Sequence, residues 1–169
     1  VINSTDMLRK IFPLICFLFA ANMALSQTAP VKKIVAYRQS VIPGKKPSPH
    51  ETVKKNEQLS LYLEIAKNKT IKFSGIWIDN EYYLFTLKKV TKTPIEKSAG
   101  DEGGKFIAVP KMVNDVYEIV LGKKQEPAPR PGTMLGNNLQ NNEVVLYYSY
   151  NGKQYFALLK KIKQLETIS

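Results

Sequence analysis

The chain is short of the residues that build most catalytic and metal centres. Its 169 residues include one cysteine, Cys16, and one histidine, His50. This is too few to supply a structural zinc site, which needs several Cys or His ligands. Because Cys16 falls in a segment that we expect to be removed, the mature chain would carry no thiol and no disulfide. A cysteine-free exported domain is more typical of a bacterial envelope than of animal secretion, where small domains depend on disulfides.

His50 offers no catalytic arrangement either. It lies in a stretch rich in proline and lysine, and its neighbours Ser48 and Glu51 are too close in sequence for their proximity to indicate a triad. A glycoside hydrolase would need two carboxylates that face each other across a cleft, and no spacing pairs any two acidic residues here. Asp101-Glu102 lies in a glycine-rich loop but lacks the spacing of a calcium-binding loop. We therefore predict a protein that is not an enzyme, with no catalytic residue, metal or cofactor.

Arginine is scarce although the chain is strongly basic. The formal net charge is +11, and almost all of the positive charge comes from lysine, with arginine only at 9, 38 and 130. Arginine is favoured for bidentate recognition of phosphate, whereas lysine is a strongly hydrated point charge. We therefore predict a solvated basic surface that can be attracted to an anionic envelope surface, and no sequence-specific binding of nucleic acid.

Long apolar runs are missing, but the N-terminal part has the features of an export signal. Two basic residues precede an apolar run over 11–21, and small residues follow at the positions that a signal peptidase reads. The run contains Pro13 and is shorter than the ~20 residues that a spanning helix needs. We predict a cleavable signal helix over 1–26, with Met7 as the true start. A single domain over 27–169 is then secreted or periplasmic and does not span the membrane.

The clearest structural pattern is a pair of β-prone runs joined by Asn151-Gly152. Asn-Gly between two such runs predicts an antiparallel hairpin, because a type I′ turn needs positive φ at both central residues. A weaker copy of this pattern is centred on Asp79-Asn80. We predict a hairpin at each place, but the similarity between the two segments is too slight to establish an internal duplication.

The rest of the chain predicts further strands and no helix after the signal. Aliphatic residues alternate with others over 59–65, which predicts a half-buried strand and the first member of a three-stranded meander through the first hairpin. Gly75, inside a strand, predicts a bulge or a close backbone approach. The segment 122–142 is rich in proline, glycine and asparagine and is predicted to be an irregular connection. Residues 163–169 are predicted to be a frayed tail.

About eight predicted strands at short spacing indicate an all-β domain. Our first choice of architecture is an antiparallel β-sandwich with immunoglobulin-like topology, because the loops are long and uneven. The characteristic cysteine and tryptophan spacing of that topology is absent, so this choice depends on the number of strands. A small up-and-down barrel is the second choice. We recognise no family signature in these residues.

Aromatic residues concentrated in the two hairpins indicate where a binding site would lie. Exposed Tyr and Trp rings stack on sugars or anchor protein interfaces, although cross-strand aromatic pairs also stabilise sheets. The candidate ligand-binding residues are Trp77, Tyr82, Tyr147, Tyr148 and Tyr150, and alternation places Tyr147 on the opposite face from Tyr148 and Tyr150. We predict an exported, non-enzymatic β-sandwich module that binds a protein or glycan partner at the cell envelope. The alternative is a lipocalin-like barrel that carries a small apolar ligand.

Overall fold

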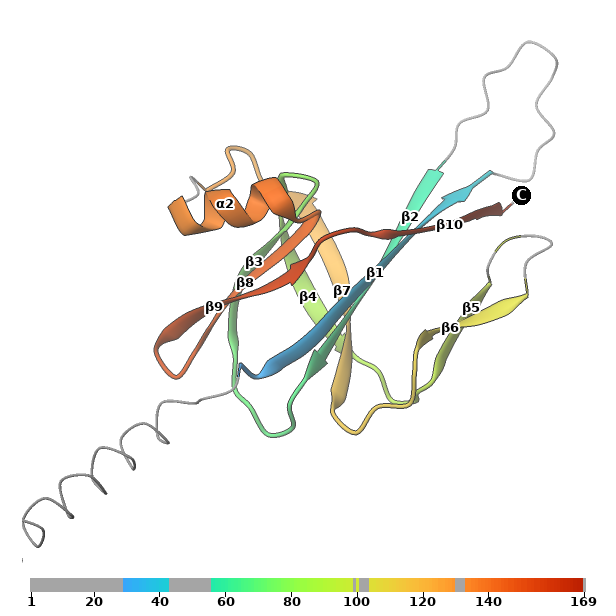
Figure 1. Ribbon diagram of the computed structural model, residues 1–169, viewed down its shortest axis with the longest axis horizontal. Coiled ribbons are helices and arrows are strands. Elements are labelled where there is room, and N and C mark those ends of the chain that lie inside the picture. The colour runs from blue at the N-terminus through green and yellow to red at the C-terminus, as the bar shows by residue number, and fades with distance from the viewer. Residues whose placement is uncertain (1–28, 43–55, 99, 101–103, 130–132, 169) are drawn as a thin grey trace, which may run out of the picture.

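The computed structural model describes residues 29–42, 56–98, 100, 104–129 and 133–168. The predicted signal helix, His50 and Asp101-Glu102 lie outside these ranges. The described part of the chain is mostly strand with one short helix, which confirms the all-β prediction (Figure 1). The elements in chain order are β1 (Val31–Val41), β2 (Asn56–Ile65), β3 (Lys72–Ile78), β4 (Glu81–Lys89), β5 (Ile95–Ser98), β6 (Lys105–Val109), β7 (Asp115–Lys124), α2 (Thr133–Asn141), β8 (Val144–Tyr150), β9 (Lys153–Leu159) and β10 (Lys163–Ile168).

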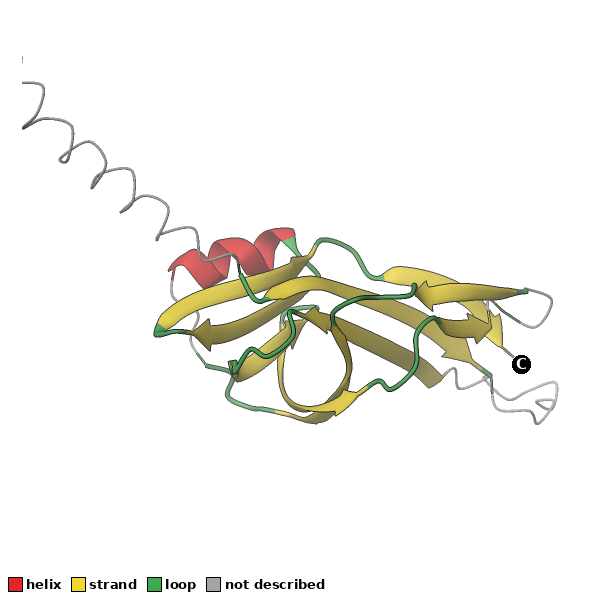
Figure 2. Cartoon of the chain, turned by 90° about the horizontal axis from the view of Figure 1, so that it is seen from below, coloured by secondary structure: helices red, strands yellow, loops and turns green. Residues whose placement is uncertain are grey.

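The main strands form one curled sheet in the order β10-β1-β2-β7-β4-β3-β8-β9. Neighbouring strands are antiparallel except for β1 and β10, which are parallel. Because β9 also contacts β1, the sheet curls until one edge approaches the strand beside the other edge (Figure 2). The segment that joins β9 to β10 leads the chain from one edge strand of the sheet to the other. A sandwich of two packed sheets is not confirmed, since only β5 and β6 lie outside the main sheet, as a separate hairpin.

The predicted three-stranded meander is wrong in its pairing. The strand β2 lies between β1 and β7, whereas β3 lies between β4 and β8. The turn that follows β2 therefore carries the chain across the curled sheet instead of joining two neighbours. The alternating pattern of β2 predicts a strand correctly, but a pattern along one strand carries no information about its partners.

Both predicted hairpins are confirmed. At the first turn, Asp79 and Asn80 have φ of 49° and 66°, and at the second, Asn151 and Gly152 have φ of 49° and 73°. Positive φ at both central residues is what a type I′ turn requires. The first strands of the two hairpins, β3 and β8, pair with each other. The two hairpins thus form one continuous half of the sheet, β4-β3-β8-β9.

Apolar side chains fill the inside of the curl. Burying one large aliphatic or aromatic side chain contributes about 1.5–3 kcal/mol, so this cluster is the main source of stability. It includes Ile162, which is 1% exposed and lies between β9 and β10. The tail that was predicted to fray therefore continues from a buried anchor into β10, which pairs with β1. The fully buried aliphatic and aromatic members of this core are Leu61, Leu63, Ile76, Val144, Leu146, Tyr148 and Ile162.

The sequence predicted that β2 would be buried on one face only. In the structure it is buried on both faces. Tyr62, on its outer face, is 5% exposed and packs with Val109 and Val116. Tyr37 of β1 donates a hydrogen bond of 2.7 Å to the carbonyl oxygen of Ala108. The β5–β6 hairpin and the segment that follows it therefore cover the outer face of β1 and β2.

The segment 122–142 is not an irregular connection throughout. The strand β7 continues to Lys124, and α2 follows at Thr133–Asn141. Gly136 and the asparagines of α2 have low helix propensity, which is why the sequence predicted no helix here. The helix lies on the outside of the curled sheet (Figure 2) and contacts β8, so tertiary packing stabilises it.

Candidate functional site

The sequence-predicted aromatic residues divide between the two faces of the sheet. Tyr148 is 1% exposed and belongs to the core, and Tyr150 packs against the same core. Trp77, Tyr82 and Tyr147 lie on the outer face, opposite the core. The structure therefore brings three of the candidates together across β4, β3 and β8, and it separates the other two from them.

Trp77 lies in a covered row of the outer face. It pairs with Tyr82 of β4 on one side and with Val145 of β8 on the other. Trp77 is 5% exposed and Val145 is 0% exposed, although neither belongs to the inner core. Because α2 contacts β8 on the outside of the sheet, we attribute the burial of this row to α2. The tryptophan is thus a support beneath the surface and not a surface contact.

Tyr82 lies along the sheet over Gly75. A Cβ atom at Gly75 would come within 2.2 Å of Tyr82 Oη, so only glycine allows the ring this position. The ring centroid is 5.1 Å from that of Trp77, and the hydroxyl donates a hydrogen bond of 2.7 Å to the carbonyl oxygen of Ser74. Desolvation by burial raises the pKa of Tyr82. The register of β3 also shifts between Phe73 and Gly75, so the predicted bulge and the close approach are both present.

A second row of the outer face is open to solvent. Tyr147 of β8 pairs with Gly75 on one side and with Phe156 of β9 on the other. The Tyr147 and Phe156 rings stack with centroids 5.2 Å apart and an interplanar angle of 24°, and both are partly exposed. Leu84, on the same face of β4 as Tyr82, is 47% exposed. Leu158, which pairs with Val145 at the β9 end of the Trp77 row, is 42% exposed. We call this set the aromatic face, and its members are Tyr82, Leu84, Tyr147, Phe156 and Leu158.

Polar side chains border the aromatic face. Lys72 of β3 pairs with Ser149 of β8, which pairs in turn with Gln154 of β9. Lys72 and Gln154 are exposed, and Ser149 is partly exposed. Aromatic rings therefore lie one step along the strands from hydrogen-bonding groups. Sites that bind sugars or amphipathic protein surfaces use this combination, because the rings supply contact area and the polar groups fix orientation.

Three members of the aromatic face were not predicted as site residues, namely Leu84, Phe156 and Leu158. The signal for Phe156 was present in the sequence, because a two-residue turn pairs positions equidistant from it. The turn at Asn151-Gly152 therefore places Phe156 opposite Tyr147. The exposure of Leu84 and Leu158 depends on what packs over the outer face of the sheet, which the sequence does not reveal.

A separate hollow, which we call the end hollow, lies where β2 ends and β3 begins. Its volume is about 560 Å³. One wall consists of Phe73, Leu87 and Tyr117, which are partly buried residues of the inner face. The turn residues Asn68 and Lys69 lie at its rim and are exposed. The end hollow is thus the open end of the core, with apolar side chains inside and polar ones at the mouth.

Some of the charged side chains around the end hollow are paired and others are not. Asp115 lines it, and its carboxylate is 3.0 Å from Lys89 Nζ, so the two charges are paired. The hydrogen bond to Asp115 raises the pKa of Lys89. Lys69 Nζ lies 5.9 Å from the centre of the Tyr150 ring. Among the described residues, no carboxylate is within ion-pair distance of Lys69.

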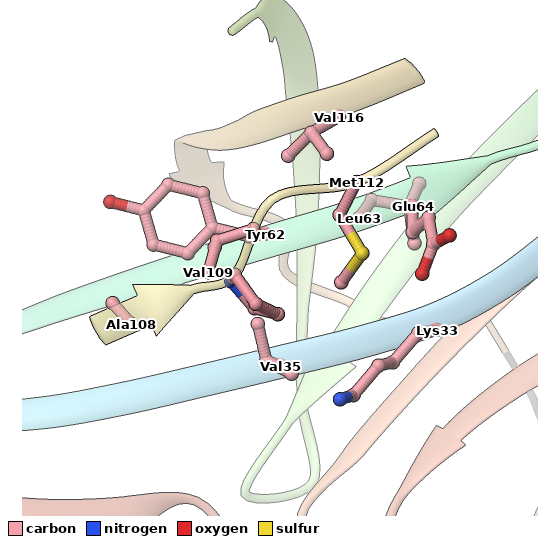
Figure 3. Close-up of a pocket in the computed structure, with 10 residues that line it drawn as sticks. Lys33, Val35, Tyr62, Leu63, Glu64, Ala108, Val109, Met112 and Val116 are labelled. Carbon is pink, nitrogen blue, oxygen red and sulfur yellow. The ribbon is translucent and has the colours of Figure 1, made fainter. Parts of the chain in front are cut away.

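A third opening lies between β1, β2 and the segment that joins β6 to β7 (Figure 3). Its walls are largely apolar and include Val35, Tyr62, Met112 and Val116. The cavity measures about 10 Å³, which is room for one water molecule at most. It is a packing defect beneath the β5–β6 hairpin and not a ligand site.

The described residues supply no grouping of His, Cys, Asp and Glu that could hold a metal ion. In the same ranges, α2 is too short and polar to cross a membrane, and no other helix is long and apolar enough. Comparison with models of protein families, with curated proteins and with solved structures finds no match for this chain. Function is therefore inferred from the aromatic face and the end hollow.

Proposed function

We propose that this protein is an exported, non-enzymatic all-β module that binds a protein or glycan partner at the cell envelope through its aromatic face. The observation that carries this proposal is the row of partly exposed rings, Tyr82, Tyr147 and Phe156, on one side of the half-sheet β4-β3-β8-β9. Aromatic side chains are preferred anchors of interfaces, because they bury a large area and lose little rotamer freedom.

The rings are held in place without a partner, which supports a binding role. Tyr82 is fixed between Gly75 and Trp77, and its hydroxyl is hydrogen-bonded to backbone. Tyr147 is fixed by stacking on Phe156. A surface that is already ordered loses less conformational entropy when a partner binds. The polar row beside it offers hydrogen-bonding groups to either a sugar or a peptide.

The lipocalin-like alternative has less support. A single curled sheet favours a barrel over a sandwich, but its strand order is not the up-and-down order of our second predicted architecture. A carrier, however, needs an unfilled interior. The inside of this sheet holds Leu61, Leu63, Ile76 and Tyr148, each at most 1% exposed. A ligand in the centre would have to displace these side chains.

The basic charge of the chain supports a location against an anionic surface. Lys and Arg number 25 against 14 Asp and Glu, and a basic surface raises the local concentration of anionic polymers. Attraction of this kind increases the rate of encounter, whereas the aromatic face would provide the specific contacts. We therefore propose lysine as the source of general attraction and the rings as the source of recognition.

The experiment is a glycan array and a pull-down from envelope extract, both with the purified protein. Phe156→Ala and Leu158→Ser remove exposed parts of the aromatic face, and Ile107→Ala, at a site 58% exposed on β6, is the matched control. Binding should fall about tenfold or more in the two face variants, because a central interface residue contributes roughly 2 kcal/mol, and it should persist in Ile107→Ala. Thermal melts establish that each variant folds. Folded face variants that bind like the unchanged protein would disprove the proposal.

A further inference from the structure

The end hollow has the volume of a small-molecule site, and polar and apolar groups share its accessible surface. Its volume of about 560 Å³ falls within the range of about 300–1,000 Å³ that is usual for ligand pockets. Phe73, Leu87 and Tyr117 come from three different strands and converge on it. Each of these side chains packs on the core with one side and is only partly buried. Apolar surface is therefore left uncovered at this end of the sheet.

The charge at the mouth selects the kind of ligand. Asp115 is the acidic residue that lines the end hollow, and its charge is already paired with Lys89. Lys69 has no such partner among the described residues. An adjoining hollow of about 390 Å³ shares Asp115 and is lined by Lys67 and Lys89 as well. The surplus of positive charge disfavours a cationic ligand and favours an anionic one.

We propose that the end hollow binds an amphiphile with an aliphatic chain and a carboxylate head. The chain lies against Phe73, Leu87 and Tyr117, and the carboxylate contacts Lys69, with Asn68 beside it at the rim. The apolar chain removes exposed core surface from water, and the head remains at the solvent-exposed mouth, where its desolvation costs little. This site is on the core side of the sheet, so it is independent of the aromatic face and of the function proposed for it.

The experiment is isothermal titration of the full-length protein with dodecanoate and with dodecylamine, both below their aggregation concentrations. The two probes share one chain length and differ in the charge of the head. Dodecanoate should bind saturably and dodecylamine at least tenfold more weakly, because like charges repel at the mouth. Absence of saturable dodecanoate binding, or equal binding of the two probes, would overturn the proposal.

Variants then locate the site. Lys69→Gln, at an exposed position, should weaken the binding of dodecanoate roughly fivefold. This corresponds to a loss of about 1 kcal/mol of binding free energy for one solvent-exposed charge. Lys123→Gln, an exposed lysine near the far end of β7, is the matched control and should bind normally. Leu87→Trp fills the hollow and should abolish binding of both probes. Equal effects of the two lysine variants would overturn the proposal even if Leu87→Trp failed to fold.

Amide chemical shifts distinguish this site from the aromatic face. Dodecanoate should move the signals of Lys69, Phe73 and Tyr117 and leave those of Tyr147 and Phe156 unchanged. Shifts confined to Tyr147 and Phe156 would assign the ligand to the aromatic face and overturn the proposal for the end hollow. Because the two sites lie on opposite faces of the sheet, failure of one proposal is visible independently of the other.

Discussion

Gly75 determines how Tyr82 can lie on the sheet. Without a side chain at 75, the tyrosine ring lies on the backbone of β3, contacts Trp77 and hydrogen-bonds to Ser74. A glycine inside a strand normally weakens it, and an aromatic residue on the neighbouring strand offsets that loss by covering the exposed backbone. The same pair supports the proposed binding surface, because it fixes one of the exposed rings.

Gly75→Ala should lower the free energy of unfolding by about 1–3 kcal/mol, the usual cost of forcing a group into a packed position. The new Cβ would lie 2.2 Å from Tyr82 Oη, so the ring must move away and lose its hydrogen bond to Ser74. Urea denaturation monitored by tryptophan fluorescence measures the change, and Trp77 reports on the site itself.

Gly104→Ala is the matched control, because nothing lies within 4 Å of a Cβ at that position. Its effect should stay within about 0.5 kcal/mol. In a Tyr82→Ala background, Gly75→Ala should lose most of its cost, since the clashing ring is absent. A cost that is equal in both backgrounds would show that the strain arises from the backbone and not from Tyr82.

Residue-level prediction succeeded where the local chemistry decided the outcome. The turns at 79–80 and 151–152 follow from the tolerance of Asn, Asp and Gly for positive φ. Alternation correctly separated Tyr147 from Tyr148. It could not say which of the two was buried, because both faces of β8 carry large apolar side chains and the difference depends on what packs over each face.

Two elements were not predicted because tertiary contacts, and not local sequence preferences, stabilise them. The helix α2 contains Gly136 and several asparagines, which favour other conformations, and its contact with β8 compensates for that. The strand β10 is exposed over much of its length and has no strong alternation, but β1 provides a backbone partner along Tyr37 to Val41. The strand β1 is far from β10 in the sequence, whereas β8 follows α2 directly. In both cases the stabilising contact forms only in the folded sheet, so local patterns contain no sign of either element.

Gly136→Ala should stabilise the protein by about 0.5–1 kcal/mol, because alanine loses less conformational entropy than glycine in a helix interior. Nothing lies within 4 Å of a Cβ at this position, so no clash opposes the gain. The midpoint of urea denaturation measures the effect. The identical change at Gly152, which has φ of 73°, should instead be destabilising. A neutral or destabilising Gly136→Ala would mean that α2 contributes little to the folded state.

The fold class could be predicted from the sequence, but the sheet order could not. Strand-forming patterns and turn residues identify an all-β chain wherever they occur. The order β10-β1-β2-β7-β4-β3-β8-β9 depends on which surfaces bury each other after the chain has curled. The aromatic face and the end hollow are products of that order. The first needs β3 beside β8, and the second needs β3, β4 and β7 to converge at one end.

Closure of the curled sheet through β1 and β10 joins segments that are far apart in the sequence. Tyr37 of β1 pairs with Lys163 of β10, and the crossing from β9 to β10 is anchored by Ile162. The backbone N–H of Ile162 donates a hydrogen bond of 2.6 Å to the carboxylate of Glu143. Closing a loop between residues that are far apart in the sequence costs conformational entropy, and the contacts that offset this cost form only afterwards. We therefore expect the two hairpins to form early and the β1–β10 closure to form last.

Ile162→Ala tests this order. A buried isoleucine replaced by alanine costs about 2–5 kcal/mol, and if closure comes last, nearly all of this loss should appear as faster unfolding. Leu146→Ala, at 0% exposure in the second hairpin, is the matched change and should slow folding as well. Stopped-flow kinetics in urea separate the two rates. Slower folding of Ile162→Ala by the full amount would mean that closure of the sheet is part of the folding nucleus.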